Sequence, residues 1–306
     1  MGDNYHITPG FDMRGAAYNE PPRLDVLHRA WFDKWLTGID NGIEKYGPVT
    51  LKQQGGGWTT TTGFPHPGVE YQRMYLSAAP SGTGGHSRRD GSLVAAKPAD
   101  NARLTVAPGL RSICSRDSAQ STARITGILP FCSTDERFRE AEGLTFTSTP
   151  VPEEVTISGP IALHLNTVLD ATDGYWTTTV NDVAHDGKST VLTSGQLVVS
   201  VREVDDSRSK RSKNGDYTDP VPYIELERHK PLVPGQPTTV DIQVTATEAV
   251  LKPGHRLRID VFASNFPKGQ PLGPFFFPSG AKPRHLQLDP SAPSFVNIAT
   301  SGRSGW

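Results

Sequence analysis

The sequence has almost no net charge and lacks long apolar stretches. Its formal net charge is −1, from 31 basic and 32 acidic residues. A nearly neutral chain has no broad electrostatic field to attract nucleic acid or anionic lipid, so neither is expected as a partner. No apolar stretch approaches the roughly 18 residues that a transmembrane helix needs, which also argues against a membrane partner.

Cysteine is scarce as well, with Cys114 and Cys132 as the two examples. Two buried free thiols are one interpretation. A disulfide is the other; it would indicate an oxidising compartment and, for a loop of this size, would contribute roughly 3 kcal/mol to stability. The residues Met1–His6 have neither the basic start nor the apolar run of a signal peptide. The compartment therefore stays open.

The motif of a serine nucleophile is missing. A nucleophile elbow reads Gly-x-Ser-x-Gly, because glycines let the strand turn sharply into a helix. Ser87 has the first glycine but is followed two residues later by Arg89, and Ser304 is followed in the same way by Trp306. Neither serine fits the motif.

No cofactor or metal site is predicted. The cysteines have no nearby partners that would complete a four-ligand zinc set. Asp170 and Asp173 could contribute to a calcium site, but turn chemistry explains both equally well. Phe275–Phe277 is unusual for a loop, and either a substrate entrance or cover for the end of the domain would account for it.

One helix is predicted, over residues 24–37. Leu24, Leu27, Trp31 and Trp35 recur at spacings of three and four, which places them on one helical face. Gly38 follows as the residue that ends the helix in a left-handed conformation. A face with two tryptophans predicts that the helix docks against a substantial partner surface. We expect the helix to lie against the side of the domain that follows.

Beyond residue 47 the apolar pattern changes to alternation, which predicts half-buried strands. Many short strands separated by Gly, Pro, Asn and Asp clusters indicate a mainly β fold, an antiparallel sandwich or jelly roll. No helical pattern returns between the strands, which argues against a parallel sheet. The basic segment 207–216 is interpreted as a solvated hairpin tip in preference to a nucleic-acid patch. The alternating runs are Val49–Leu51, Ile161–Leu165, Leu197–Val201, Val240–Val244 and Leu257–Val261.

Three segments resemble one known family. In chain order they are Phe32–Gly38 (Phe-Asp-Lys-Trp-Leu-Thr-Gly), Pro253–Arg258 (Pro-Gly-His-Arg-Leu-Arg) and Ser264–Pro267 (Ser-Asn-Phe-Pro), and they are similar to motifs of the cocaine-esterase/Xaa-Pro dipeptidyl-peptidase family of serine hydrolases. The resemblance covers about the whole chain. It implies the C-terminal portion of such an enzyme: residues 1–47 as a remnant of an α/β-hydrolase domain, and residues 48–306 as a galactose-binding-like jelly roll.

The resemblance also implies which catalytic parts are present. The family's triad histidine lies shortly before the closing helix, and the interval from Gly2 to His6 matches, which makes His6 the candidate base. The nucleophile and its orienting aspartate would come from an α/β-hydrolase domain, in cis or in trans. His6 cannot act alone, because a base needs a nucleophile beside it. His255 and His285 are expected to brace a turn or strand end.

Two functions are therefore carried forward. The first is the C-terminal part of a serine hydrolase acting on esters or dipeptidyl amides by acyl transfer, inactive as this chain alone. The second is a stand-alone jelly-roll binding or interaction module. The aromatic helix and the His6 spacing favour the first, because an independent module needs neither. Self-association into a homo-oligomer is a further expectation, since the helix would expose its aromatic face.

Overall fold

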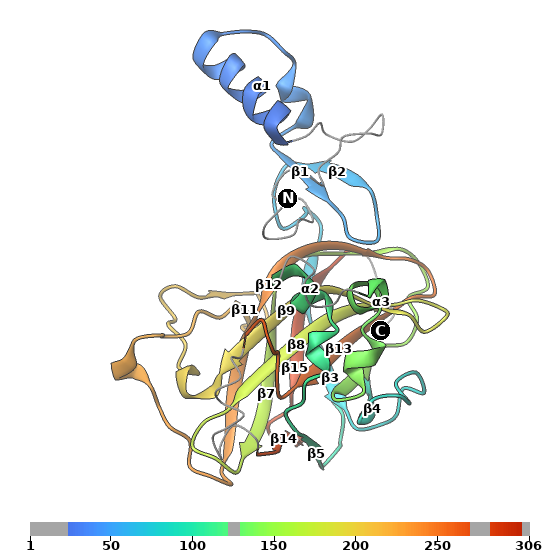
Figure 1. Ribbon diagram of the computed structural model, residues 1–306, viewed down its shortest axis with the longest axis vertical. Coiled ribbons are helices and arrows are strands. Elements are labelled where there is room, and N and C mark those ends of the chain that lie inside the picture. Colours follow the sequence, from blue (N-terminus) through green and yellow to red (C-terminus); the bar gives the residue numbers. More distant parts are fainter. Residues whose placement is uncertain (1–23, 122–128, 270–281, 302–306) are drawn as a thin grey trace.

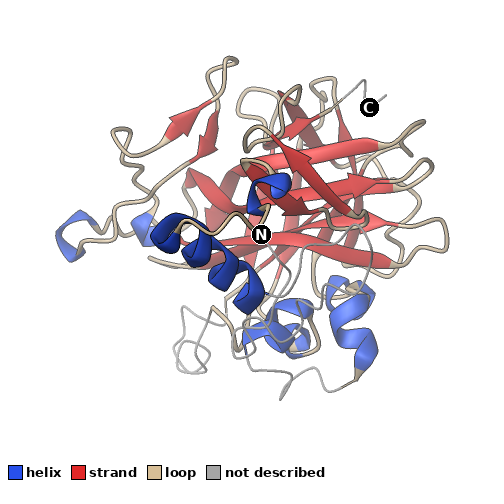
Figure 2. Cartoon of the chain, turned by 90° about the horizontal axis from the view of Figure 1, so that it is seen from above, coloured by secondary structure: helices blue, strands red, loops and turns tan. Residues whose placement is uncertain are grey.

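The computed structural model describes residues 24–121, 129–269 and 282–301, and it is mainly β (Figures 1 and 2). Two antiparallel ribbons accompany one eleven-stranded sheet. The predicted fold class is confirmed. The strands are β1 Val49–Lys52, β2 Trp58–Thr61, β3 Glu70–Ser77, β4 Arg89–Val94, β5 Ala102–Val106, β6 Leu144–Thr147, β7 Val155–Leu169, β8 Tyr175–Val183, β9 Ser189–Val198, β10 Lys210–Arg211, β11 Tyr217–Asp219, β12 Pro237–Leu251, β13 Arg256–Phe262, β14 Arg284–Leu288 and β15 Phe295–Thr300.

The large sheet closes on itself around one core. Its strand order is β12-β9-β8-β13-β6-β4-β3-β15-β7-β14-β5, and β12 pairs with β7 as well, so the two strands join distant parts of the sheet. The β7–β12 pairing is antiparallel and runs from Val155↔Leu251 to Val168↔Pro237. Trp176 is one of the largest side chains of the core and is 0% exposed. Other members of the core are Met74, Phe146, Ile157, Leu163, Leu165, Ile242, Ile259 and Ile298.

A bulge interrupts the long β7–β12 ladder. Val244 pairs with Ile161 and Thr247 with Gly159, so two residues of β12 lie opposite Pro160. Proline has no N–H to donate to a ladder, and a bulge is where sheets accommodate it. The Thr245 carbonyl accepts a hydrogen bond from the Thr193 hydroxyl on β9 instead, at 2.6 Å. The bulge therefore ties β12 to β9, where the two strands barely pair.

The expectation that no helix returns between strands was wrong. A helical segment lies between β5 and β6 (Figure 1). Its helices are four to six residues long, too short to show a 3.6-residue period in the sequence. None of the helices in the described residues is long and apolar enough to cross a membrane. The helices are α1 Leu24–Thr37, α2 Arg116–Ser121, α3 Pro130–Thr134 and α4 Arg137–Glu140, with 3-10 turns η1 Ile43–Tyr46, η2 Arg111–Ile113, η3 Val199–Val201 and η4 Leu226–Arg228.

Of the two interpretations of the cysteines, the disulfide is confirmed. Cys114 and Cys132 are bonded, with a Cα–Cα distance of 4.5 Å. The bond joins the residue that follows η2 to α3. It therefore closes the helical segment, whose short helices have little stability of their own.

Removing this bond should lower the stability of the whole domain. For the C114S/C132S double variant we expect the free energy of unfolding to fall by about 3 kcal/mol, because an 18-residue separation closes a long loop in the unfolded chain. Urea unfolding followed by tryptophan fluorescence measures this. Reductant should destabilise the wild type by a similar amount and leave the double variant unchanged; equal midpoints for both proteins without reductant would contradict the expectation.

The N-terminal helix has the predicted bounds, Leu24–Thr37, and Gly38 follows it at φ 74°. Its predicted place was wrong. Helix α1 does not lie against the side of the sandwich but stands away from it, beyond the β1–β2 ribbon (Figure 1). The sequence run Val49–Leu51 is a strand, as predicted, but it belongs to this ribbon and not to the large sheet.

Polar contacts explain the place of the helix. Lys34 forms ion pairs with Asp40 at 3.1 Å and Glu44 at 2.9 Å, and the Asn41 side chain donates to the Ala30 carbonyl at 2.7 Å. These contacts fold the following loop and η1 back onto α1. They hold one side of the helix and leave its aromatic side without a partner among the described residues.

Candidate functional site

The first functional feature is the aromatic face of α1. Trp31, Phe32 and Trp35 are 55%, 56% and 60% exposed, and the two indole rings lie 5.6 Å apart. Leu36 beside them is 75% exposed. Three large aromatic side chains on one helix form an apolar surface of the kind that marks an interaction site.

The second feature is the anchor that ties the segment bearing α1 to the sandwich. Gln54, in the turn of the β1–β2 ribbon, inserts its side chain between β9 and β12. Its amide nitrogen donates to the Leu192 carbonyl at 2.6 Å and to the Thr247 hydroxyl at 2.7 Å, and its amide oxygen accepts from Arg116 at 2.7 Å. The Gln54 backbone also exchanges hydrogen bonds with β12, donating to Glu248 and accepting from Val250. One glutamine thus joins the ribbon, both strands and α2.

Gly55 allows this close approach. Its φ is 78°, in the left-handed region that glycine tolerates, and a Cβ built there would lie 2.6 Å from the Val250 carbonyl oxygen. A side chain at this position would push the ribbon off β12. The direction in which the ribbon leaves the sandwich is therefore fixed by backbone contact.

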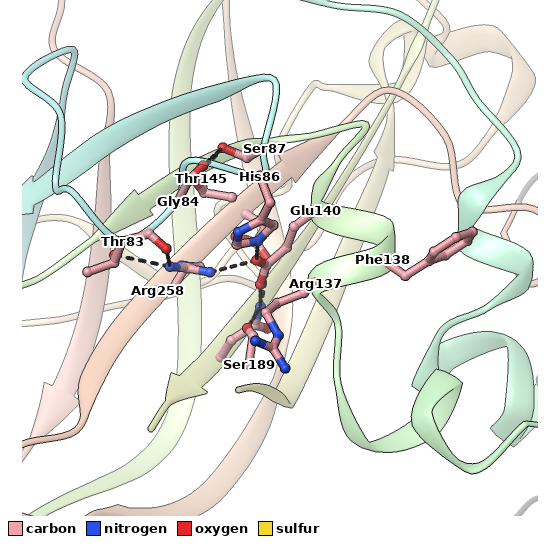
Figure 3. Close-up of polar contacts among 12 residues, drawn as sticks. Thr83, Gly84, His86, Ser87, Arg137, Phe138, Glu140, Thr145, Ser189 and Arg258 are labelled. Atoms are coloured by element: carbon pink, nitrogen blue, oxygen red, sulfur yellow. Dashed lines mark hydrogen bonds and ion pairs between the residues drawn. The ribbon is translucent and has the colours of Figure 1, made fainter. Parts of the chain in front are cut away.

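The third feature is a buried charge network between β13 and α4 (Figure 3). Arg258 is 0% exposed; its guanidinium donates to Glu140 at 2.6 Å, to the Thr147 hydroxyl at 2.9 Å and to the Thr83 carbonyl at 3.0 Å. His86 contacts the same Glu140 oxygen. Burial alone would raise the pKa of Glu140, but the His86 hydrogen bond and the Arg258 charge hold that pKa below its ordinary value.

Two further buried carboxyls extend the network. Burial raises the pKa of Asp260 well above its ordinary value, and the charge of Glu140 raises it further. Burial also raises the pKa of Glu136 to about 7, although Arg139 lies 3.1 Å away. The network thus links α4 to the sheet through one ion pair and carboxyls held toward their neutral forms. Its contacts fasten the helical segment, and it has no nucleophile placed for acyl transfer.

One arrangement outside this network imitates a catalytic triad. The Thr105 hydroxyl lies 2.9 Å from Nδ1 of His285, and Nε2 of His285 lies 3.3 Å from Asp170. Thr105 and His285 are direct cross-strand partners on β5 and β14. Because Thr105 lies within a strand and not on a strand-to-helix turn, it lacks the geometry of an activated nucleophile. The contact between Thr105 and His285 braces the β5–β14 strand pair, which is the role expected for His285.

The remaining predicted residues are placed as follows. His255 pairs with Asp182 at 2.7 Å at the start of β13, in keeping with a bracing role. Asp173 accepts from the Ser200 backbone and hydroxyl, and no group of three or more His, Cys, Asp or Glu in the described ranges could hold a metal ion. His6 and Phe275–Phe277 lie outside the described residues.

The basic segment is the hairpin that was predicted. β10 and β11 pair around Asn214–Gly215. Two of its charged side chains have partners outside it: Arg211 pairs with Asp206 at 3.0 Å, and Asp216 accepts from Arg73 on β3. The second of these contacts ties the hairpin to the large sheet.

Known proteins match this chain over most of its length. Residues 41–293 match the X-Pro dipeptidyl-peptidase C-terminal non-catalytic domain. A putative Xaa-Pro dipeptidyl-peptidase from Streptomyces avermitilis is 27% identical over 84% of this chain and 36% of its own length. The cocaine esterase of Rhodococcus sp. is 24% identical over 79% of this chain and 38% of its own length. This chain therefore spans little more than a third of these relatives.

Solved structures agree on the fold. A CocE/NonD family hydrolase from Staphylococcus aureus superposes with a TM-score of 0.61 at 16% identity, over 90% of this chain and 45% of that one. An aminopeptidase from a marine sediment Thaumarchaeota archaeon superposes with a TM-score of 0.64 at 15% identity, over 90% and 44%. With the matched family model, these findings show that the chain belongs to the family of X-Pro dipeptidyl-peptidase C-terminal non-catalytic domains.

Proposed function

We propose that this chain is the C-terminal, non-catalytic part of a serine hydrolase that cleaves esters or dipeptidyl amides, and that it docks onto an α/β-hydrolase domain through α1. The observation that carries the proposal is the exposed Trp31–Phe32–Trp35 face, held clear of the sandwich by the ribbon. A partner domain could bury this face without displacing any strand. That domain is joined in cis or supplied by another chain.

In the assembled enzyme, His6 is the proposed triad base, on the evidence of its spacing from Gly2 and its position before α1. Acyl transfer needs a nucleophile beside its base and oxyanion donors aimed at the developing charge. The partner domain would contribute the serine and the orienting aspartate. The sandwich would hold α1 in a fixed direction, because the Gln54 hydrogen bonds fix how the ribbon leaves the sandwich.

The chain alone is therefore expected to be inactive. A chromogenic acyl ester and a dipeptidyl p-nitroanilide should both be hydrolysed at the uncatalysed rate, and a fluorophosphonate probe should label no serine. Turnover that the probe abolishes, with the label on a serine of this chain, would disprove the proposal.

The docking surface can be tested without its partner. At increasing concentration we expect the chain to self-associate in sedimentation velocity, because exposed tryptophans bury each other when no other surface is offered. The W31S/W35S double variant should weaken this association about tenfold or more, since tryptophans dominate interface energies. Leu226, which is 78% exposed on η4, provides the control, and L226S should associate like the wild type. A chain that stays monomeric throughout would favour the stand-alone module.

A further inference from the structure

A pocket lies between the β10–β11 hairpin and β12, at the bulge where β12 passes Pro160. Its volume is about 550 Å³, which is within the range of pockets that take small-molecule ligands. None of the residues that line it belongs to α1, so it is separate from the docking face. One side of the pocket is apolar and the other carries charged groups.

The apolar side is made of two aromatic rings and two prolines. Phe64 and Pro65 come from the segment between β2 and β3, Tyr71 from β3 and Pro160 from β7. The Tyr71 hydroxyl is used within the fold, because it donates to the Pro160 carbonyl at 3.0 Å. Burial raises the pKa of Tyr71 to about 12, so this side chain is neutral. Such rings bind apolar groups by burying them from water.

The charged side is formed by the hairpin. Lys210 and Asp219 are direct cross-strand partners, yet no ion pair joins them. Asp219 instead accepts a hydrogen bond from the Gln243 side chain at 2.5 Å, and its second oxygen has no partner among the described residues. Lys210 is exposed and forms no ion pair within the described part of the chain. Arg211 also lines the pocket, but it is already paired with Asp206 at 3.0 Å.

We propose that this pocket binds the zwitterion of an apolar amino acid or of a short apolar peptide. The ligand ammonium would donate to the open oxygen of Asp219, and the ligand carboxylate would accept from Lys210. Directly opposed residues of an antiparallel pair have Cβ atoms about 5 Å apart, so one small ligand can reach both charges. Its apolar side chain would then lie against Phe64 and Tyr71. The inference is independent of the proposed function, because it rests on the pocket alone.

The test is a titration of the full chain followed by NMR. L-Phenylalanine should produce saturable shifts of the backbone amides of Asp219 and Ala246, which line the pocket. Phenethylamine lacks the carboxylate and 3-phenylpropanoate lacks the ammonium, so each should bind about tenfold more weakly or worse, having lost one charge-assisted hydrogen bond. L-Phenylalanyl-L-alanine is a further arm. Tighter binding of this dipeptide than of L-phenylalanine points to a peptide as the natural ligand, and weaker binding points to a free amino acid.

Variants assign each charge to its residue. D219N, whose side-chain carbonyl can still accept from Gln243, should weaken L-phenylalanine and phenethylamine about tenfold and leave 3-phenylpropanoate unchanged. K210M should weaken L-phenylalanine and 3-phenylpropanoate and leave phenethylamine unchanged. K213M removes an exposed lysine of the same hairpin that does not line the pocket, and it should bind like the wild type. Thermal unfolding verifies that each variant is folded.

Three results would overturn the proposal. The first is equal binding of all three phenyl compounds by the wild type, which would leave only an apolar site. The second is the absence of saturable shifts with any of them. The third is L-phenylalanine binding that neither D219N nor K210M weakens.

Discussion

Replacing Arg258 by methionine should destabilise the domain by about 3–5 kcal/mol, the range found when one partner of a buried ion pair is removed. Arg258 is 0% exposed, and so is the Glu140 side chain that it contacts. Methionine fills similar space but leaves Glu140 without its guanidinium partner, and it removes the donors to Thr147 and Thr83. Chemical unfolding followed by the fluorescence of the tryptophans measures the loss.

Two controls identify the cause of this loss. R256M changes the same residue type two positions earlier, where the side chain is only partly buried and donates to the Ser148 carbonyl, and it should cost far less. R258M/E140Q removes the stranded charge as well, so it should be more stable than R258M alone, with a coupling energy that shows the two residues act together. If R258M and R256M lose equal stability, the network does not support the fold in this way.

Arg258 also shows where reading the sequence fails. In β13, arginine and aspartate alternate with Leu257, Ile259 and Val261, a pattern typical of a strand with one face in water. That interpretation was wrong for Arg258 and Asp260, both 0% exposed. The reason is tertiary: the helical segment between β5 and β6 covers the second face of the strand and brings Glu140 to Arg258, and His86, from the loop between β3 and β4, contacts the same Glu140.

Local patterns predicted local structure well. The apolar spacing over 24–37 and the glycine after it specify α1, and these signals lie within one stretch of chain. The family motif at Pro253–Arg258 predicted the kind of domain for the same reason. Gln54 carries no such signal, because its importance depends on the ribbon reaching β9 and β12, which lie more than 130 residues further along the chain.

Glu136 should make the stability of the domain fall as pH rises from about 4.5 to about 7. Its pKa is about 7 in the folded protein, against an ordinary 4.5, because burial disfavours its charged form and Asp117 and Glu140 add like charge. The folded state therefore holds a proton that the unfolded chain releases in this window, and stability decreases with pH wherever the folded state binds more protons. The difference of about 2.5 pKa units corresponds to about 3 kcal/mol.

E136Q isolates this contribution, because glutamine imitates the protonated carboxyl and cannot ionise. Near pH 4 the variant and the wild type should be about equally stable. By pH 8 the variant should be more stable by about 3 kcal/mol, since it never adds a third buried negative charge to those of Asp117 and Glu140. Exposed Glu153 gives the matched control: E153Q changes the net charge equally and should track the wild type at every pH. Unfolding midpoints measured from pH 4 to pH 8 decide the matter. A gap between E136Q and the wild type that does not widen with pH would mean that the Arg139 guanidinium, 3.1 Å away, keeps Glu136 ionised throughout.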